Sequence, residues 1–536
     1  MSTLTNLETF LEKYPAESGT RINYGTSGFR HKADKLSHIA FRVGIFAVLR
    51  ARYKKAIIGA IITASHNPEE DNGIKFIDPM GEMLEDSWES LVTDLANVPD
   101  DQVDKTVQAL IARFGIDMAT DGIVYVGRDT RKSSPTLCEA LLAGIKVANG
   151  TSIDFGLLTT PQLHYIVRSK NTNGQYGEPT EDGYYQKLSN AFLRLNQLIG
   201  NNPNYKPHLV VDGANGIGAL QLTKFSKFIG DKLTFEIVHE PQGILNYQCG
   251  ADFVKVNQRE PKSIVLKVDQ RYASFDGDAD RIIYYYKNSK DDKFHMLDGD
   301  KIAVLVAKYL KETLAAAAFD DIAVSIVQTA YANGSSTIYM REVLNMETFC
   351  VPTGVKHLHH KAGQCQVGVY FEANGHGTIL FSEDVERRIK QSTNPKAIQL
   401  SHFIDLVNQT VGDAISDMLV VETILNSLNI TIEDWDSLYN DLPNRLLKQE
   451  VVDRNVITTT DAERRCVLPS GLQAAIDETV GHFGSKARSF VRPSGTEDVV
   501  RIFAEAQSQT DADLLAKKVA NLVFDFANGV GQKHQL

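Results

Sequence analysis

Apolar positions along the chain repeat one order of elements three times. Each copy begins with a short apolar run typical of a buried strand, continues through a loop of small residues into an amphipathic helix, and ends in a second strand. The copies begin at Ile123 (IVYVGRDTRKSSPTLCEALL), Leu209 (LVVDGANGIGALQLTKF) and Val324 (VSIVQTAYANGSSTIYM). This order predicts βαβ units with mainly parallel strands and right-handed crossovers, and therefore three related mixed α/β domains.

The C-terminal part of the chain has a different pattern. SFVRPSGTEDVVRIFAEAQ predicts two strands joined by a polar turn, and DADLLAKKVANLVFDFA predicts an amphipathic helix after them. We therefore expect a smaller α+β domain there, joined by a connector around 431–445. Because a chain of 536 residues exceeds what one hydrophobic core supports, we divide it into four domains, at residues 1–190, 191–300, 301–430 and 431–536.

Composition and charge narrow the class of ligand. Apolar residues make up 43% and charged residues 23% of the chain, which are ordinary values for a globular protein. The formal net charge of -11 argues against nucleic acid or an anionic membrane as the main partner, so we expect a small-molecule ligand. The sequence leaves the oligomeric state open, with a slight preference for a monomer.

Cysteine usage and the N-terminal residues predict a cytoplasmic protein. The cysteines are widely spaced and form no CxxC motif, so we expect reduced thiols in the core, at positions 138, 249, 350, 365 and 466. The N-terminal stretch MSTLTNLETFLEKYPAESG has acidic residues and no apolar signal core. The longest apolar run is far short of the ~18 residues that span a bilayer.

The first loop with candidate chemistry is TASHNPEEDNGIK, residues 63–75, which follows an apolar run. It presents the Ser65 hydroxyl, which we expect to be exposed at the end of a buried strand, near His66 and Lys75. Because loops at the carboxyl ends of strands gather ligands in open α/β sheets, this serine is a candidate for chemistry. The alternative is a plain helix N-cap made by Ser65 or Asn67.

The second loop is DGDADR, between the apolar runs YASF and IIYYYK, which predict the two strands of a hairpin. Asp276, Asp278 and Asp280 place three carboxylates in a tight turn, and their mutual repulsion predicts a hard cation with oxygen ligands. Arg281 stands at the sixth position, where an EF-hand needs glycine, so an EF-hand is excluded. Three carboxylates leave the cation room for water or a phosphoryl oxygen. The alternative is a solvated acidic turn.

Two further loops carry groups that suit a phosphorylated sugar. FEANGHG offers Glu372, Asn374 and His376 for bidentate hydrogen bonding to sugar hydroxyls, although an ordinary hairpin turn would have the same pattern. RPSGTEDVVR, residues 492–501, has an arginine at each end and small polar residues between them. This composition predicts a pocket for a phosphate dianion, and the alternative is an ordinary type I or II turn after Pro493.

The motifs TASHNP, DGDADR, FEANGHG and RPSGT, in this order over nearly the whole chain, resemble those of the α-D-phosphohexomutase superfamily. Within it, the chain is similar to the phosphoacetylglucosamine mutases of the eukaryotic type. The sugar loop reads EANGHG, where relatives acting on glucose or mannose phosphates have a serine-containing version. In addition, GRDTR, residues 127–131, follows the serine loop, whereas the equivalent motif precedes it in most relatives. The resemblance implies four domains around a central cleft, each contributing one such loop.

The resemblance also implies a phosphoryl carrier and a metal site. Ser65 would carry the phosphoryl group. Asp276, Asp278 and Asp280 would hold Mg²⁺ together with a phosphate oxygen on Ser65.

Basic and substrate-binding residues follow from the same resemblance. Arg30 in GTSGFR, Lys75 and Arg281 match basic residues around the reacting phosphate, and Lys75 or His66 is the candidate for proton transfer. The segment TGVKH, residues 353–357, stands where relatives have a specificity loop. The residues that would bind the sugar and the phosphate that is not reacting are Thr353, Gly354, Glu372, Ala373, Asn374, Arg492, Pro493, Ser494, Gly495, Thr496 and Arg501.

The implied activity is an intramolecular phosphotransfer that interconverts N-acetylglucosamine 6-phosphate and N-acetylglucosamine 1-phosphate through a sugar 1,6-bisphosphate, feeding UDP-N-acetylglucosamine synthesis. The implied cofactors are Mg²⁺, the phosphate carried on Ser65 and a sugar bisphosphate as activator. The implied partners are amino-sugar phosphates, with no nucleic acid and no membrane.

Three other functions stay open. One is the same mutase chemistry on glucose or mannose phosphates, and another is a non-catalytic sugar-phosphate sensor on the same fold. The third is an oxidoreductase, because Gly213, Gly216 and Gly218 follow a strand and Glu240 ends the next one. Their GxxGxG spacing differs from the dinucleotide fingerprint GxGxxG, and tight helix–strand packing explains the glycines equally well.

Overall fold

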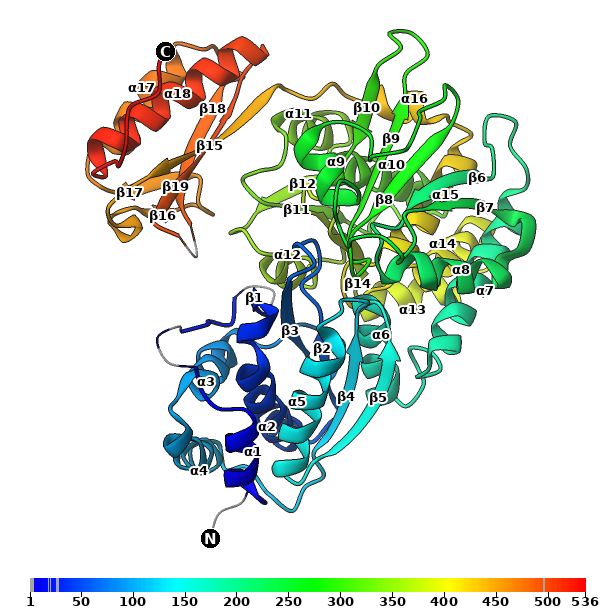
Figure 1. Cartoon of the computed structure of the whole chain (residues 1–536). Helices are drawn as coiled ribbons and strands as arrows, with labels where there is room; N and C mark the ends of the chain where they lie inside the picture. The colour runs from blue at the N-terminus through cyan, green and yellow to red at the C-terminus, as the bar shows by residue number, and fades with distance from the viewer. Residues whose placement is uncertain (1–3, 18, 20, 26–27, 495–496) are drawn as a thin grey trace. The chain divides into compact units, whose positions relative to one another are not determined.

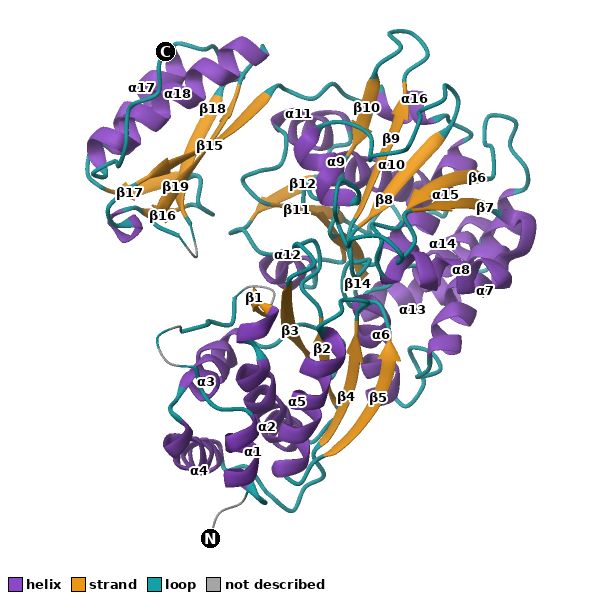
Figure 2. Ribbon diagram, viewed as in Figure 1, coloured by secondary structure: helices purple, strands orange, loops and turns teal. Residues whose placement is uncertain are grey.

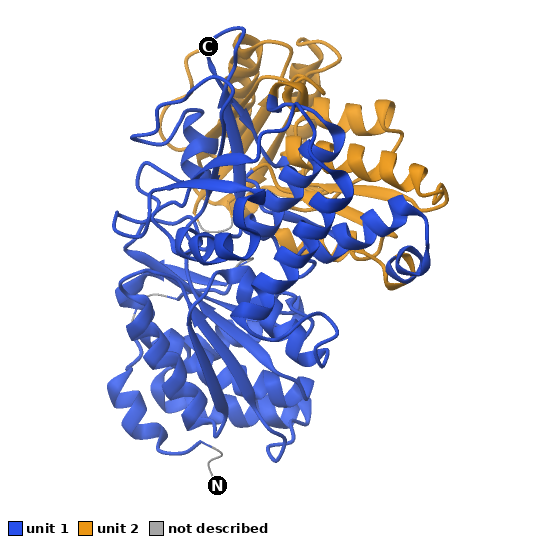
Figure 3. Cartoon of the chain, turned by 90° about the vertical axis from the view of Figure 1, so that its right-hand side faces the viewer, with its two compact units in different colours: residues 1–299, 374–379, 386–432 blue, residues 300–373, 380–385, 433–536 orange. Residues whose placement is uncertain are grey.

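The computed structural model describes residues 4–17, 19, 21–25, 28–494 and 497–536 (Figure 1). The chain forms two compact units (Figure 3). Unit 1 contains residues 1–299, 374–379 and 386–432, and unit 2 contains residues 300–373, 380–385 and 433–536. Within the described ranges, no helix combines the length and the apolar character needed to cross a membrane.

The first sheet of unit 1 is made of β1 (Phe29–Lys32), β2 (Ile58–Ile62), β3 (Asp71–Ile77), β4 (Ile123–Arg128) and β5 (Thr151–Leu157). Its strand order is β1-β3-β2-β4-β5 (Figure 2). Strands β2, β4 and β5 are parallel neighbours, which confirms the first predicted βαβ unit, whereas β3 is antiparallel to both of its neighbours. Because β3 follows β2 as a hairpin partner, no helix follows Ser65, and the helix-cap interpretation of this serine is wrong.

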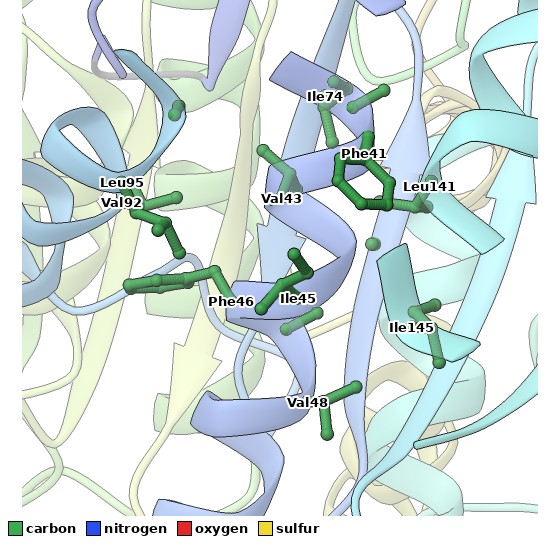
Figure 4. Packing of buried hydrophobic residues seen from close by; sticks show 14 of the residues in the cluster. Phe41, Val43, Ile45, Phe46, Val48, Ile74, Val92, Leu95, Leu141 and Ile145 are labelled. Carbon is green, nitrogen blue, oxygen red and sulfur yellow. The ribbon is translucent and has the colours of Figure 1, made fainter. Parts of the chain in front are cut away.

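The helices around this sheet are α1 (Leu7–Lys13), α2 (Ser37–Lys54), α3 (Asp86–Asn97), α4 (Val103–Phe114), α5 (Ser134–Val147) and α6 (Thr160–Asn171). Helix α2 is buried along most of its length and packs against α3 and α5. Figure 4 shows part of this core, with Phe41, Val43, Ile45, Phe46 and Val48 of α2, Val92 and Leu95 of α3, and Leu141 and Ile145 of α5. Each fully buried side chain of this size contributes about 1.5–3 kcal/mol, so the core fixes the strands whose ends carry the site.

The second sheet of unit 1 is made of β6 (His208–Asp212), β7 (Thr234–Val238), β8 (Arg271–Phe275), β9 (Ile282–Lys287) and β10 (Phe294–Leu297), in the order β10-β9-β8-β6-β7. The accompanying helices are α7 (Glu181–Ile199), α8 (Ile217–Ile229), α9 (Ala251–Asn257), α14 (Pro395–Leu406) and α15 (Ala414–Leu428). Strands β6 and β7 are parallel around α8, and β8 and β9 form the predicted hairpin. Strand β7 ends at Val238, so Glu240 lies in the loop beyond it, contrary to the expectation.

The third sheet is made of β11 (Val324–Gln328), β12 (Glu347–Cys350), β13 (Val367–Phe371) and β14 (Gly377–Phe381), in the order β12-β11-β13-β14. Its helices are α10 (Gly299–Ala316), α11 (Gly334–Ile338), α12 (Val355–Ala362) and α13 (Glu383–Gln391). Strands β11 and β12 are parallel, which confirms the third predicted βαβ unit.

The C-terminal part of unit 2 has an antiparallel sheet of β15 (Asn444–Glu450), β18 (Arg488–Pro493) and β19 (Val499–Glu505), and a short hairpin of β16 (Thr458–Thr460) and β17 (Arg465–Leu468). Its helices are α16 (Ile432–Asp436), α17 (Leu472–Gly481) and α18 (Gln509–Phe526). The predicted α+β character and both predicted strands are confirmed. The predicted connector is not a plain linker, because it contains α16, whose fully buried Trp435 donates from Nε1 to the carbonyl oxygen of Lys301 at 3.0 Å.

All five cysteines are free thiols, as predicted. Cys138, Cys249 and Cys466 are buried, whereas Cys350 and Cys365 are only partly buried. The expectation that all of them lie in the core is therefore wrong for these two, because Cys350 is on the edge strand β12 and Cys365 is in the turn after α12.

Candidate active site

Ser65 lies in the loop between β2 and β3, with its backbone in the left-handed region (φ 53°). Its hydroxyl donates to Asp276 Oδ2 at 2.6 Å and lies 3.5 Å from Asp280 Oδ1. The side chain is completely buried, so the expectation of an exposed hydroxyl is wrong. The reason is tertiary: the carboxylate loop from the second sheet covers the serine.

Arg131, the last residue of GRDTR, holds the serine loop by its backbone. Its Nη2 donates to the carbonyl oxygens of Ser65 and Asn67, both at 2.9 Å, and its Nη1 donates to those of Pro68 (2.5 Å) and Asp71 (2.9 Å). The guanidinium is fully buried and paired with Asp129 at 3.0 Å. The motif that distinguishes this chain by its position along the sequence is therefore a structural support for the serine.

The carboxylate loop joins β8 and β9 and brings Asp276, Asp278 and Asp280 together, all buried. Asp276 Oδ1 accepts from the backbone N–H groups of Asp280 (3.0 Å) and Arg281 (3.2 Å), which fixes the turn. Lys75, on β3, donates to Asp278 Oδ2 at 2.8 Å and to Asp280 Oδ2 at 3.1 Å. The serine loop and the carboxylate loop, which the resemblance assigns to one metal site, thus lie together within unit 1.

The glycines of VVDGANGIGAL pack beneath this loop. A Cβ on Gly216 would lie 2.5 Å from the carbonyl oxygen of Gly277, and a Cβ on Gly218 would lie 2.9 Å from Ala279 Cβ. The carbonyl oxygen of Gly277 also accepts from the Ile217 N–H at 3.2 Å. Close approach to the carboxylate loop therefore explains Gly216 and Gly218, and close packing against Ala219 of α8 explains Gly213, so the dinucleotide interpretation loses its basis.

The three carboxylates fit a divalent cation. One oxygen from each lies within 4.8 Å of the others, which is a spacing that a single ion can span. Asp278 Oδ1 is buried and has no hydrogen-bond partner among the described residues, so an electron pair is left for a ligand. Burial and the charges of Asp280 and Asp278 raise the pKa of Asp276 well above its usual value.

Three basic residues surround the same point. Burial alone would lower the pKa of Lys75, but Asp278 and Asp280 raise it above its usual value, so Lys75 is an ammonium ion. Arg281 Nε lies 3.8 Å from Asp280 Oδ1. Arg30, on β1, donates from Nη1 to Asn67 Oδ1 at 3.3 Å, and its Nε is buried with no partner in the part of the chain that the structure describes.

His66 differs from these cations in its charge. The positive charge of Arg281, burial and the charge of Arg30 lower the pKa of His66 well below its usual value, so the ring is neutral. Its Nδ1 is buried and makes no hydrogen bond to any described residue.

One residue of the site, Thr160, was not assigned from the sequence, and another, His376, was assigned only to sugar hydroxyls. Thr160, at the start of α6, donates its hydroxyl to Asp278 Oδ2 at 2.6 Å. His376 is 5% exposed, and its Nδ1 donates to the carbonyl oxygen of Asp280 at 2.7 Å. The signals were the TTP segment at the end of the first βαβ unit and the histidine of FEANGHG, but only the fold places either residue beside the aspartates.

The remaining predicted residues lie mainly in unit 2. Arg492 and Arg501 are backbone partners on the neighbouring strands β18 and β19, which places two positive charges side by side. Arg492 Nε donates to Glu463 Oε1 at 2.8 Å, and the N–H and hydroxyl of Thr353 donate to Glu463 Oε2 at 3.0 and 2.5 Å. Glu463 was not predicted.

The other members of these loops have ordinary turn positions. Pro493 ends β18, and the buried Ser494 donates its N–H to the carbonyl oxygen of Val499 at 2.9 Å. Gly495 and Thr496 lie outside the described residues. Gly354, with φ 128°, precedes α12.

The sugar loop crosses from one unit to the other. Glu372 and Ala373, after β13, are the last residues of their unit 2 segment. Asn374 begins the following unit 1 segment, and its Oδ1 accepts from the N–H of His376 at 3.0 Å.

Four family models match the chain. They are described as "Phosphoglucomutase/phosphomannomutase, alpha/beta/alpha domain I" (residues 46–103 and 97–176), "Phosphoacetylglucosamine mutase AMG1, domain II" (177–283), "Phosphoacetylglucosamine mutase AMG1, domain III" (298–430) and "Phosphoglucomutase/phosphomannomutase, C-terminal domain" (455–522). The models occur in the order of the four loops.

Individual proteins match over nearly the full length. The phosphoacetylglucosamine mutase of Sus scrofa is 51% identical over 525 residues, which is 96% of each chain. A crystal structure of Aspergillus fumigatus N-acetylphosphoglucosamine mutase with GlcNAc-6P and magnesium has a TM-score of 0.92 and 45% identity, covering 98% of this chain and 99% of the other. A serine-to-alanine variant of that enzyme with glucose 1,6-bisphosphate has a TM-score of 0.92 and 44% identity, covering 97% and 98%.

Proposed function

The chain belongs to the phosphoacetylglucosamine mutase family, and from this premise we propose that Ser65 carries the phosphoryl group when the protein interconverts N-acetylglucosamine 6-phosphate and N-acetylglucosamine 1-phosphate. The reaction passes through a sugar 1,6-bisphosphate. The product is the 1-phosphate from which UDP-N-acetylglucosamine is made.

The observation that carries this assignment is the contact between Ser65 Oγ and Asp276 Oδ2 at 2.6 Å. It places the only serine of the TASHNP loop against three buried carboxylates that fit a divalent cation. A phosphoryl group on that hydroxyl would bring close to two negative charges into a site that already has three, so it requires cations. Lys75, Arg30, Arg281 and a divalent cation bound by the three carboxylates would supply this positive charge.

The chemistry then depends on charge and position. When the phosphoryl group moves, its bond to Ser65 Oγ breaks, a bond to a sugar hydroxyl forms, and the hydroxyl proton leaves. Lys75, Arg281 and Arg30 neutralise the charge on the phosphoryl oxygens and orient them. Mg²⁺, held by Asp276, Asp278 and Asp280, supplies additional charge stabilisation when it is bound.

The two candidates for proton transfer have different charge states. Lys75 is an ammonium ion held by two carboxylates, which suits it to stabilise the transferred group. His66 is neutral and has a buried ring nitrogen without a partner among the described residues, which suits it to accept the proton.

Substrate recognition is assigned to the other two loops. We propose that Arg492, Arg501 and the turn that follows Pro493, with Ser494, Gly495 and Thr496, bind the phosphate that is not reacting. This pocket must accept either phosphate, because the bisphosphate has to reverse its orientation between the two half-reactions. Glu372, Ala373 and Asn374 would bind the sugar hydroxyls, and Thr353 and Gly354 would contact the acetamido side of the ring.

Other features of the chain remain proposals. We keep the four domains at residues 1–190, 191–300, 301–430 and 431–536, and a monomeric state. The five free thiols are typical of a reducing compartment, which supports the cytoplasm as the location.

The test supplies the 6-phosphates of N-acetylglucosamine, glucose and mannose separately, with Mg²⁺ and a catalytic amount of glucose 1,6-bisphosphate. Phosphorus NMR then follows the 1-phosphates. We expect the N-acetylglucosamine ester to be converted with the highest kcat/KM. Faster conversion of the glucose or mannose ester would show a different sugar specificity, and binding without any conversion would show a sensor.

A further inference from the structure

The backbone carbonyl groups of Ser65 and Asn67 each receive two hydrogen bonds. One pair comes from Arg131 Nη2, as described above. The second pair comes from Asn246 Nδ2, at 2.8 Å to the carbonyl oxygen of Ser65 and 3.0 Å to that of Asn67. Asn246 lies in the loop between β7 and α9, so its amide reaches the serine loop from the second sheet of unit 1.

The position of Asn246 is itself fixed. Its backbone is in the left-handed region (φ 58°), which asparagine tolerates better than most residues. Its N–H donates to the carbonyl oxygen of Ala214 at 2.9 Å, and Asn215 Nδ2 donates to the carbonyl oxygen of Ile244 at 2.9 Å. The end of the same loop is held by the Gly250 N–H, which donates to Asp212 Oδ2 at 2.6 Å.

The same amide also lies against the carboxylate loop. A Cβ on Gly277 would lie 3.0 Å from Asn246 Nδ2 and 2.5 Å from the carbonyl oxygen of Ser65. Asn246, Ser65 and Gly277 therefore meet at one point, between the residue that carries the hydroxyl and the aspartates that face it.

We propose that Asn246 is a positioning residue that sets the Ser65 hydroxyl against the carboxylate loop, and this inference rests on the proposed function. Arg131 belongs to the same sheet as the serine and can hold only the shape of the serine loop. Asn246 belongs to the sheet that carries the aspartates, so it fixes the serine loop relative to them. Because phosphoryl transfer depends on alignment, a small shift between the two loops lowers the rate more than it weakens substrate binding.

The experiment compares two substitutions in the full-length protein. Asn246→Gly removes the amide and tolerates the left-handed backbone. Asn215→Gly is the matched control, because Asn215 also has a left-handed backbone (φ 55°) and supports the same loop without contacting Ser65. For both variants, kcat and KM for N-acetylglucosamine 6-phosphate, the transfer of phosphate from glucose 1,6-bisphosphate to the protein by intact mass, and the urea midpoint are measured.

We expect Asn246→Gly to lower kcat about 10- to 100-fold, to slow phosphorylation of the protein similarly, and to change KM less than about 3-fold. Asn215→Gly should change the urea midpoint about as much as Asn246→Gly does, but its kcat should stay near that of the unmodified protein. Asn246→Asp keeps the shape of the side chain but turns an oxygen toward the two carbonyl groups, so it should also lower kcat. This variant replaces Asn246→Gly in the test if the glycine variant does not fold.

The inference would be overturned if Asn246→Gly or Asn246→Asp had the same kcat as the unmodified protein. It would also be overturned if Asn215→Gly lost as much kcat as Asn246→Gly. These outcomes differ from a failure of the proposed function, in which the unmodified protein itself would not convert N-acetylglucosamine 6-phosphate.

Discussion

The serine loop and the carboxylate loop each contain a left-handed residue, but they differ in how many of their oxygen atoms have partners within the protein. Each follows a buried strand and contains a residue in the left-handed region, Ser65 at φ 53° and Ala279 at φ 57°. In the serine loop the carbonyl groups of Ser65 and Asn67 each accept hydrogen bonds from two side chains of the protein. In the carboxylate loop three buried carboxylates face the Lys75 ammonium group and the Arg281 guanidinium, and Asp278 Oδ1 has no partner among the described residues.

Two buried aspartates show what this difference means. Asp129, under the serine loop, accepts from the hydroxyl groups of Thr63 (2.8 Å) and Ser134 (2.7 Å) and from both the N–H and Nε of Arg131 (3.0 Å each). Asp278 receives donors on one oxygen only. A buried charge with all its partners is a structural element, whereas one that lacks partners costs stability and is retained for a ligand that supplies the missing charge.

Replacing Ser65, the proposed phosphoryl carrier, gives the largest expected effect. Ser65→Ala should lower mutase activity at least about 10³-fold, because no hydroxyl remains to carry phosphate. The fold should stay intact, because Arg131 holds the loop through backbone carbonyl groups. Activity, intact mass after incubation with glucose 1,6-bisphosphate and thermal unfolding measure these effects. Near-normal turnover would remove the phosphoserine assignment.

Changing the charge of the carboxylate loop comes next. Asp278→Asn should lower Mg²⁺-dependent activity about 100-fold and abolish the increase in melting temperature on adding Mg²⁺, because the proposed ligand oxygen loses its charge. Asp269→Asn, whose side chain is 75% exposed, is the control and should behave like the unmodified protein. If Asp278→Asn kept its Mg²⁺-dependent activity, the metal would have to bind elsewhere.

A steric change tests the support beneath the carboxylate loop. Gly216→Ala would place a methyl group 2.5 Å from the Gly277 carbonyl oxygen, so we expect the free energy of unfolding to fall by about 1–3 kcal/mol. The comparison is Gly481→Ala at the end of α17, where no atom lies within 4 Å of the added carbon. Urea unfolding measures both, and equal stabilities would show that the contact between these loops is not tight.

The smallest expected effect concerns pH. His164, on α6, is buried and donates from Nδ1 to the Gly81 carbonyl oxygen at 2.7 Å, and burial lowers its pKa from 6.5 to about 3. Below pH 6.5 the unfolded state binds a proton at His164 more readily than the folded state does. The stability that this residue contributes is therefore complete above pH 6.5 and is lost as the pH falls toward 3. His164 is thus neutral and gives the nearby aspartates no charge.

The effect of His164 is measurable by urea unfolding at two pH values. Between pH 6.5 and 5.5 the unmodified protein should lose about 1 kcal/mol through this residue, and His164→Gln should lose correspondingly less. His482→Gln, at an exposed position, is the surface control and is measured in the same way. Identical pH dependence in His164→Gln and the unmodified protein would mean that the imidazole is not buried as a neutral group.

Local patterns were sufficient to predict the elements and the chemical groups. Periodicity located the three βαβ units, because strand and helix spacing are properties of adjacent residues. The repulsion in DGDADR indicated a cation, because three carboxylates in one turn meet wherever that turn is placed. The burial of Ser65 and the roles of Arg131, Asn246, Thr160 and His376 could not be predicted in this way.

The sequence by itself determined that this chain has α/β domains, a serine at a strand end and a carboxylate turn, since each depends on residues within a few positions of one another. The resemblance placed the serine and those aspartates at one Mg²⁺ site, but only the tertiary structure decided that the serine is buried, that its hydroxyl donates to Asp276 across 211 positions of sequence, and that Arg131 and Asn246 converge on its backbone. The physical reason is that these contacts join residues far apart in the sequence, and those of Asp276 and Asn246 also join separate sheets. Their geometry follows from how the strands and helices pack, which no local spacing specifies.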